Sequence, residues 1–398
     1  MKIGVYLTGY EPQSGGGYTF ESDLFAELLL HVNSVGSERF CLIVPEENVT
    51  PKFLELLPPS LQVVKVRTKR FMGRFLALLA SECSFYRAHS KSLSPLDRAA
   101  KSVGIDFIWF LAAGNHRTDI PYLTVVWDLQ HRATPWFPEF SAKGMWDRRE
   151  LNHRSFLQRA AAIITGTEQG KIELKKYYEI DEEKILLLPH PTPSFALKAG
   201  EAKEDVSLNL GVEGRYILYP AQFWPHKNHI NLLEAMDIYI KNGGPALTLV
   251  CVGSDKGNRE FVEQAAKKLD IENFIKFLGF VSRAQLIALY KNAVALTYAS
   301  YCGPENLPPL EAFAIGCPVL ASNIPGAKEQ FGDAAILFSP ENPEEIALKI
   351  RILVEDDELR SSLIARGRIR AEQWTTKEYI TKAVSYLNKF SHTRKNWP

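Results

Sequence analysis

The sequence lacks the features that would assign it at once to a secreted, a membrane-spanning or a nucleic-acid-binding class of protein. Its five cysteines are odd in number and no two have Cys-x-x-Cys spacing, which argues against a disulfide framework and a zinc site. No stretch approaches the roughly 20 apolar residues of a membrane span. The apolar run Ile3–Leu7 is too short for a signal peptide. We therefore expect a cytoplasmic protein with reduced thiols.

The charge balance is also uninformative about partners, because the formal net charge is only +1. Overall charge therefore favours no nucleic acid partner, and only a local patch could do so. One segment, 65–76, mixes basic and apolar residues in a way that can dock on an anionic membrane surface. Its basic residues are Lys65, Arg67, Lys69, Arg70 and Arg74. A solvated helix face is the alternative, and no aromatic and basic sheet motif supports RNA binding.

Short apolar runs alternate with amphipathic stretches along all 398 residues, a pattern typical of parallel sheets with helices on both faces. The alternation lapses over 191–209, where Pro, Gly, Lys and Glu indicate a linker. The sequence predicts an α/β protein with two Rossmann-like, doubly wound domains, 1–190 and 210–375. The last segment, 376–398, is expected to be a helix that crosses back onto the first domain. Because ligands of such sheets bind beyond the carboxyl ends of the strands, the chemistry is expected in the loops that follow strands.

The most informative loop runs from Tyr301 to Val319 and leads from a predicted strand into a predicted helix. Asn306 suits the N-cap and Pro308 the first turn. Such a helix start offers N–H groups and partial positive charge to an anion. Glu311, about one turn further along, could accept both hydroxyls of a ribose. The alternative is that Glu311 only complements the positive end of its helix, and the residues alone leave both interpretations open.

A second loop, from Tyr219 to His229, also joins a predicted strand to a predicted helix. Lys227 is expected just before the helix, facing the same cleft. A diphosphate leaving group needs such a cation, and each charge-assisted hydrogen bond contributes roughly 1.5–3 kcal/mol. An exposed, solvated lysine is the alternative, which the surrounding Trp, Pro and His make less favoured.

Two loops of the first domain could complete the site. Gly15, Gly16 and Gly17 would let the backbone approach a ligand closely, although a flexible surface loop is the alternative. They do not form the G-x-G-x-x-G motif, which weakens an NAD-dependent oxidoreductase as an interpretation. In the other loop, Asp128 and His131 could accept a proton or bind sugar hydroxyls, and a structural histidine is an equally weighted alternative.

Several segments together resemble the retaining GT-B glycosyltransferases of family four, also called glycosyl transferases group 1. They are Asn306–Ala312 with Gly316–Val319, Phe277–Val281, Gly326–Phe338, and Lys227–His229 with Leu232–Ala235. The resemblance implies a GT-B fold, a nucleotide-sugar donor, transfer with retention and no divalent metal or other cofactor. It also implies that Glu311 binds the donor ribose, Lys227 the diphosphate, and the backbone around Val281 the nucleobase. The helix start at Asn306, Leu307 and Pro308 belongs to the same donor site.

The chain departs from the family pattern at three positions. The first glutamate of the family's pair falls on Gly303, and Glu305 is a candidate replacement. The arginine that often precedes the diphosphate lysine corresponds to Gln222. A histidine often precedes the aspartate of the first-domain loop. Trp127 stands there, with His131 as a candidate source of the imidazole.

The resemblance is nearest to bacterial enzymes that build lipopolysaccharide or exopolysaccharide. We expect transfer of mannose or rhamnose from a nucleotide-diphosphate donor to a saccharide or lipid-linked acceptor, in the cytoplasm or at the inner face of the membrane. The alternatives are a nucleotide-sugar epimerase and a catalytically silent partner subunit, the latter suggested by Gly303 and Gln222.

Overall fold

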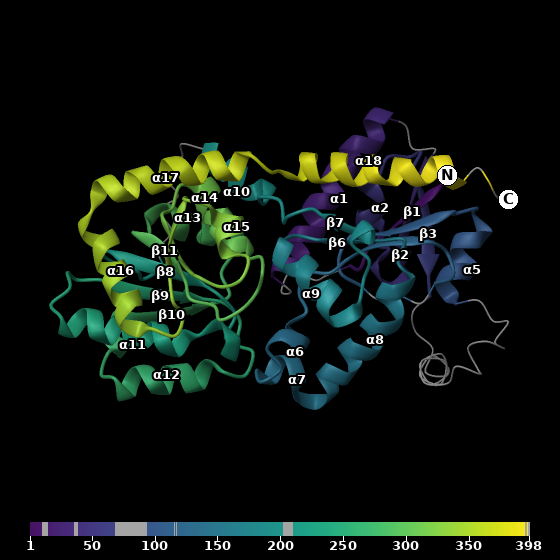
Figure 1. Ribbon diagram of the computed structural model, residues 1–398. Coiled ribbons are helices and arrows are strands. Elements are labelled where there is room, and N and C mark those ends of the chain that lie inside the picture. The colour runs from purple at the N-terminus through teal and green to yellow at the C-terminus, as the bar shows by residue number, and fades with distance from the viewer. Residues whose placement is uncertain are drawn as a thin grey trace.

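Two parallel sheets, each with helices packed on both faces, form two lobes that lie side by side in the computed structural model (Figure 1). The structure describes residues 1–9, 15–35, 39–67, 94–114, 116, 118–201, 210–394 and 396. All strand pairings within both sheets are parallel. The prediction of an α/β protein with two Rossmann-like domains is confirmed.

The first lobe contains a seven-stranded sheet in the order β3-β2-β1-β4-β5-β6-β7. Its strands are β1 Ile3–Tyr6, β2 Phe40–Pro45, β3 Gln62–Val66, β4 Phe107–Phe110, β5 Tyr122–Val125, β6 Ala162–Thr165 and β7 Ile185–Leu187. The helices described in this lobe are α1 Gly16–Val35, α2 Pro51–Glu55, α5 Pro95–Ser102, α6 Gln130–Ala133, α7 Pro138–Ser141, α8 Met145–Arg159 and α9 Glu168–Tyr178. Gly16 and Gly17 thus lie in the first turn of α1 and not in a free loop.

The second lobe contains a six-stranded sheet in the order β10-β9-β8-β11-β12-β13, the strand order of dinucleotide-binding sheets. Its strands are β8 Tyr216–Pro220, β9 Thr248–Val252, β10 Ile275–Gly279, β11 Ala295–Tyr298, β12 Val319–Ser322 and β13 Ala335–Phe338. Its helices are α10 Ser194–Glu201, α11 His229–Lys241, α12 Arg259–Lys268, α13 Arg283–Asn292, α14 Leu307–Ile315, α15 Ala327–Phe331, α16 Pro343–Glu355 and α17 Asp357–Glu372.

Strands buried on both faces explain why the apolar runs in the sequence are nearly continuous. In the first lobe, Ile3 and Val5 point to one side of β1 and pack with α1, whereas Tyr6 points to the other side. This alternation is the period of two that every strand has. The second lobe has one large core cluster around β8 and α14.

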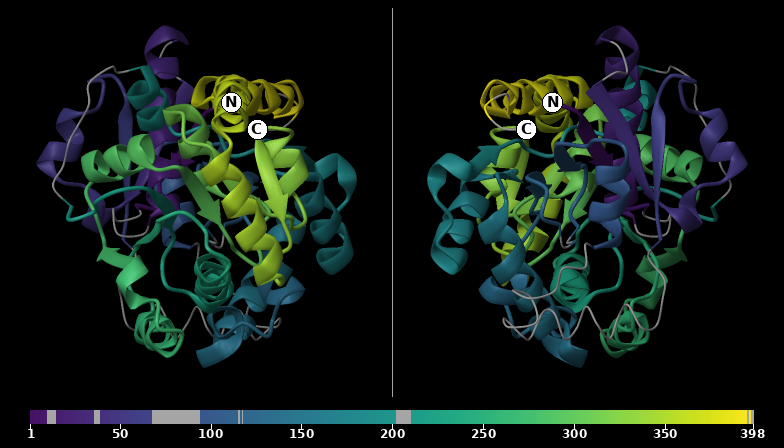
Figure 2. Two further views of the ribbon diagram at one scale, coloured as in Figure 1. Left: turned by 90° about the vertical axis from the view of Figure 1, so that its left-hand side faces the viewer. Right: turned by 90° about the vertical axis from the view of Figure 1, so that its right-hand side faces the viewer.

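The last helix, α18 Thr376–Arg394, leaves the second lobe and packs on the first (Figure 1). Its buried residues Tyr379, Ala383 and Leu387 join the core beneath α1. Arg394 forms an ion pair with Asp106 at 2.8 Å. In both views of Figure 2, the C-terminal end of the chain, drawn in yellow, lies at the top of the molecule. The first lobe is therefore assembled from both ends of the chain.

The chain passes between the lobes at two places, and hydrogen bonds tie the two crossings together. The N–H of Thr192 donates to the carbonyl of Trp374 at 3.1 Å, and the indole N–H of Trp374 donates to the carbonyl of Pro189 at 2.8 Å. The Thr192 hydroxyl donates to the carbonyl of Ala371. Any movement of one lobe against the other has to pivot here.

Most of the basic segment proposed for membrane contact, including Lys69, Arg70 and Arg74, lies outside the described residues. Arg67 is described, and it forms an exposed ion pair with Glu46 at 3.1 Å. None of the described helices has both the length and the apolar character that a membrane span requires.

Candidate functional site

The second lobe places its two informative loops side by side at the point where the strand order reverses. Strands β8 and β11 are neighbours in the sheet, and their carboxyl ends lead into the loops that carry Lys227 and Glu305. A topological switch point of this kind is where open α/β sheets bind ligands. The sheet order therefore brings Lys227 and α14 to one edge.

Lys227 ends a single 3₁₀ turn, Pro225–Lys227, directly before α11. Its ammonium group donates to the hydroxyl of Tyr298 at 2.9 Å and to that of Ser300 at 3.5 Å. Asn228 fixes the turn in a left-handed conformation, with φ of 56°, and its amide donates to the carbonyl of Ala299 at 3.0 Å. The two hydroxyl partners carry no charge, so they position the ammonium group without neutralising it.

Glu311 lies on α14 with its carboxylate almost completely buried, at 8% exposure. Its Oε2 accepts a hydrogen bond from the Tyr290 hydroxyl of α13 at 2.8 Å. Burial raises the pKa of Glu311 to about 7, although this hydrogen bond and the nearby charge of Arg283 act in the opposite direction. A buried carboxyl group with a strongly shifted pKa is a candidate for a functional site.

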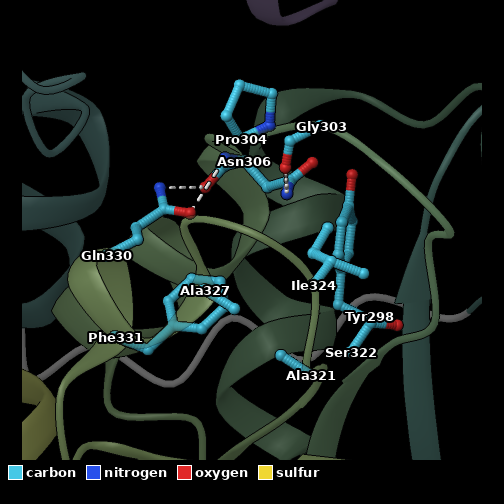
Figure 3. Close-up of a pocket in the computed structure, with 10 residues that line it drawn as sticks. All are labelled: Tyr298, Gly303, Pro304, Asn306, Ala321, Ser322, Ile324, Ala327, Gln330 and Phe331. Carbon is cyan, nitrogen blue, oxygen red and sulfur yellow. Dashed lines mark hydrogen bonds between the residues drawn. The ribbon is translucent and has the colours of Figure 1, made fainter. Parts of the chain in front are cut away.

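The start of α14 differs from the expectation in its supply of N–H groups. Asn306 occupies the N-cap position, but its side chain donates to the carbonyl of Gly303 and does not cap the helix. The side chain of Gln330 is hydrogen-bonded to both backbone polar groups of Asn306 (Figure 3). Its Oε1 accepts from the Asn306 N–H at 3.0 Å, and its Nε2 donates to the Asn306 carbonyl at 2.9 Å. Pro308 and Pro309 have no N–H. Of the first three residues of α14, only Leu307 has a main-chain N–H that could donate to an anion, which leaves Lys227 as the main candidate partner for one.

Glu305 does not take the place of the missing glutamate at Gly303, because its side chain reaches across to the first lobe. Its Oε1 accepts from the main-chain N–H of His190 at 2.5 Å, and the side chain is only 3% exposed. Burial and the neighbouring Glu329 raise the pKa of Glu305 to about 8. Together with His190, Glu305 lines a cavity of 190 Å³ between the lobes. We therefore place it at the interface of the lobes.

The glycines of the first lobe lie against the second lobe's site. A Cβ atom on Gly16 would lie 3.3 Å from the Cδ1 atom of Leu307, and one on Gly15 would lie 3.8 Å from the Nε2 atom of Gln222. The Oε1 atom of Gln222 accepts from the indole N–H of Trp224 at 3.0 Å. The first turn of α1 thus meets the start of α14, as a glycine-mediated close approach requires. Val281, half-buried, follows β10 in the same lobe.

Asp128 follows β5 and is the charged residue of its loop that remains accessible, with its side chain 32% exposed. It pairs with Arg149 of α8 at 2.7 Å and accepts from the N–H of Gln130 at 3.0 Å. Burial acts to raise its pKa, but Arg149 and the Gln130 N–H outweigh it and lower the pKa of Asp128. The carboxylate is therefore charged and fixed in orientation.

The expected role of His131 at the site is wrong. Its side chain is completely buried inside the first lobe, and Nε2 lies 2.9 Å from the Tyr178 hydroxyl. Burial lowers its pKa to about 4. The short helix α6 directs this residue inward, a direction that the sequence spacing could not reveal. The imidazole that lies near Trp127 is that of His190, with ring centroids 6.2 Å apart.

Two contributors to the site were missed by the sequence. Glu139 of α7 accepts hydrogen bonds from both the main-chain N–H and the imidazole Nδ1 of His226, directly before Lys227. Glu329 of α15 accepts from the N–H of Glu168 at the start of α9, at 3.0 Å. Both contacts join the lobes. No local signal could have found them, since each pairs residues at least 87 positions apart.

Within the described parts of the chain, no three His, Cys, Asp or Glu side chains gather in an arrangement that could hold a metal ion.

Residues 200–370 match the family model described as Glycosyl transferases group 1. The matched region contains both loops of the switch point, with Lys227 and Glu311. The chain contains a glycosyl transferases group 1 domain.

The chain has relatives at low identity. It is 26% identical over 251 residues to O-antigen chain mannosyltransferase B of Escherichia coli, covering 62% of this chain and 66% of that one. It is 26% identical over 186 residues to O-antigen chain mannosyltransferase RfbU of Salmonella typhimurium, covering 47% of this chain and 49% of that one. The matches thus span less than two thirds of each relative's length.

Solved structures share the two-lobed fold of this chain over nearly its whole length. WaaG, described as a glycosyltransferase involved in lipopolysaccharide biosynthesis, has a TM-score of 0.66 at 16% identity and covers 96% of this chain and 98% of its own. Alr3699/HepE of Anabaena, crystallised with UDP-glucose, has a TM-score of 0.66 at 17% identity and covers 98% and 100%. The expected GT-B fold is confirmed, and identities this low carry no conclusion beyond the fold.

Proposed function

We propose that the glycosyltransferase moves a sugar, with retention at the anomeric carbon, from a nucleotide-diphosphate donor to a saccharide or lipid-linked acceptor. The observation that carries this proposal is the meeting of Lys227, the start of α14 and Glu311 at one edge of the second sheet. A cation, a helix N-terminus and a buried carboxyl group are what a diphosphate joined to a ribose needs in order to be recognised.

The donor lies on the second lobe in this proposal. Glu311 accepts the ribose hydroxyls, displacing the Tyr290 hydroxyl from one of its oxygens. Lys227 and the N–H of Leu307 face the diphosphate. Negative charge grows on the diphosphate as the glycosidic bond breaks, so a cation fixed there before the reaction lowers the barrier. The backbone at Val281 borders the nucleobase. The UDP-glucose held by the structurally similar Alr3699/HepE supports a donor of this chemical class.

The acceptor lies on the first lobe in this proposal. Asp128 is charged, partly exposed and held in place by Arg149, and it can orient an acceptor hydroxyl. Mannose or rhamnose is the favoured sugar, because two of the relatives carry the name O-antigen chain mannosyltransferase. We further propose that no metal ion takes part, with the lysine supplying the charge, and that the protein works in the cytoplasm or at the inner face of the membrane.

The first experiment measures thermal stability with a panel of UDP, GDP, dTDP and their sugars. A ligand that binds the folded state at a hundredfold excess over its Kd stabilises it by about 2.7 kcal/mol. We expect a shift with one nucleotide that Glu311→Ala abolishes. Incubation with a preparation of lipid-linked saccharides and the matching labelled donor then tests transfer.

The remaining outcomes separate the alternatives. Binding without transfer, together with copurification of an active transferase, would favour a silent partner subunit, the reading that Gly303 and Gln222 suggested. Conversion of the donor sugar with no acceptor present would favour an epimerase. A chain that binds none of the nucleotides would refute the proposal.

A further inference from the structure

The lobes also touch away from the crossing segments, where α7 meets the turn that carries Lys227. In Figure 1 this contact lies near the bottom, whereas α17 and α18 run along the top. Glu139 Oε1 accepts from the main-chain N–H of His226 at 2.9 Å, and the same oxygen is hydrogen-bonded to the imidazole Nδ1. The side chain of Glu139 is 5% exposed and that of His226 12%.

Aromatic rings pack around this largely buried pair of residues. Phe140 lies 5.0 Å from the imidazole ring of His226, between centroids. Phe137 packs on Tyr301 of the second lobe at 5.7 Å. A hydrogen bond to a charged group is stronger in such an environment than in water. The contact between the lobes thus combines buried hydrogen bonds with packing of aromatic side chains.

The charge states determine which of the two side chains donates the hydrogen bond and which accepts it. Burial acts to raise the pKa of Glu139, but the two hydrogen bonds from His226 outweigh it and lower the pKa. Burial and the charge of Lys227 lower the pKa of His226. A carboxylate thus accepts from a neutral imidazole, whose proton is on Nδ1. That arrangement fixes the orientation of the ring.

The backbone of the Lys227 turn shows why Glu139 matters. The Lys227 N–H donates to Trp224, the Asn228 N–H to Pro225, and the Lys227 carbonyl accepts from the Tyr219 hydroxyl. The His226 carbonyl accepts from the N–H of Tyr301 at 2.8 Å. All of these partners belong to the second lobe. The N–H of His226 is different, because its partner, Glu139, comes from the first lobe.

Building on the proposed function, we propose that Glu139 is a positioning residue for Lys227, holding through His226 the turn that presents the ammonium group to the donor diphosphate. The lysine is then held fully in place only when α7 is seated on the second lobe. Stabilisation of the departing diphosphate is thereby linked to the arrival of the lobe that brings the acceptor. When the lobes are separated, the ammonium group of Lys227 would be less ordered, and a bound donor would therefore be hydrolysed more slowly.

The test compares Glu139→Ala and Glu139→Gln with the wild type, and uses Asp147→Asn, an exposed carboxylate of the same lobe, as the matched control. Losing a charge-assisted hydrogen bond should lower kcat roughly ten- to a hundredfold in Glu139→Ala. Glu139→Gln should fall between, because its carbonyl can still accept from the His226 N–H. The control should match the wild type.

Binding assays separate a positioning role from a general structural one. Lys227 is proposed to face the diphosphate, so Glu139→Ala should weaken UDP or GDP binding more than UMP or GMP binding. A double-mutant cycle completes the test, since adding Glu139→Ala to Lys227→Ala should lower kcat little further. Equal losses for mono- and diphosphates, or full additivity in the cycle, would overturn the proposal. A wild type that binds no nucleotide would instead refute the proposed function itself.

Discussion

The main-chain N–H of His190 donates a hydrogen bond to Glu305 at 2.5 Å. This bond joins the end of the first lobe to the loop between β11 and α14 of the second. His190 directly precedes the segment that crosses between the lobes, and Glu305 lies between β11 and α14. The loop that is proposed to receive the donor is thus in direct contact with the segments that cross between the lobes. Because burial raises the pKa of Glu305 to about 8, this contact is made at neutral pH largely by the protonated carboxyl group.

The first prediction concerns the pH dependence of stability that Glu305 causes. The folded chain keeps this proton up to about pH 8, whereas an unperturbed glutamate releases it near pH 4.5. The folded state therefore binds more protons between these values, and the free energy of unfolding falls as the pH rises through them. Glu305→Gln stays neutral at every pH. It should lie within about 1 kcal/mol of the wild type near pH 5 and exceed it by roughly 4 kcal/mol at pH 8.5.

Urea unfolding at a series of pH values from 5 to 8.5 measures this effect. Glu183→Gln, at an exposed glutamate of the first lobe, is the control and should keep the slope of the wild type. An unchanged slope in Glu305→Gln would mean that the carboxyl group ionises normally in the folded protein.

The second prediction concerns the charge of Lys227. Removing one preorganised donor from a site of developing charge typically lowers kcat about 10²- to 10³-fold. We expect a loss of that size in Lys227→Ala, because α14 supplies so few N–H groups of its own. Lys241→Ala, at an exposed lysine of α11, should change kcat less than about twofold. Steady-state kinetics with the identified donor checks both, and comparable losses would argue against a special role for Lys227.

The sequence predicted the fold well because its information there is local and repeated. Strands buried on both faces give apolar runs, and helices between them give amphipathic stretches, so the two sheets could be expected without knowing any contact between them. The placement of Lys227 and Glu311 at one edge of the second sheet could be expected for a similar reason, since each lies in a segment that follows a strand.

Contacts between the lobes could not be predicted in this way. Glu139 and His226 are 87 positions apart, and neither belongs to a motif that would indicate its partner. The misplacement of His131 has a related cause. Whether a residue of a short helix points to the cleft or to the core depends on how that helix packs, and α6 packs so that His131 is completely buried.

The third prediction follows from that burial of His131. Its Nε2 contacts Tyr178, which also donates to the buried Glu150. His131→Leu should lower the free energy of unfolding by about 1–3 kcal/mol, because a buried polar contact is lost and the space is refilled imperfectly. kcat per folded molecule should stay within about twofold of the wild type. Unfolding and kinetics on the same preparation check this, and a large loss of kcat at full folding would return His131 to the site.

The fourth prediction concerns the packing of α10, which lies in the segment predicted as a linker, against α14. A Cβ atom on Gly200 would lie far inside van der Waals distance of the carbonyl oxygen of Ala314, a backbone atom that cannot turn aside. At an unhindered helical site, replacing glycine with alanine stabilises a protein by about 0.4–1 kcal/mol. Here the sign should reverse, and Gly200→Ala should cost about 1–3 kcal/mol as the two helices are pushed apart. Lys198→Ala, at an exposed site two residues earlier on α10, should change stability by less than about 0.5 kcal/mol. Urea unfolding of both variants decides the matter. A stabilised Gly200→Ala variant would mean that α10 does not approach α14 this closely.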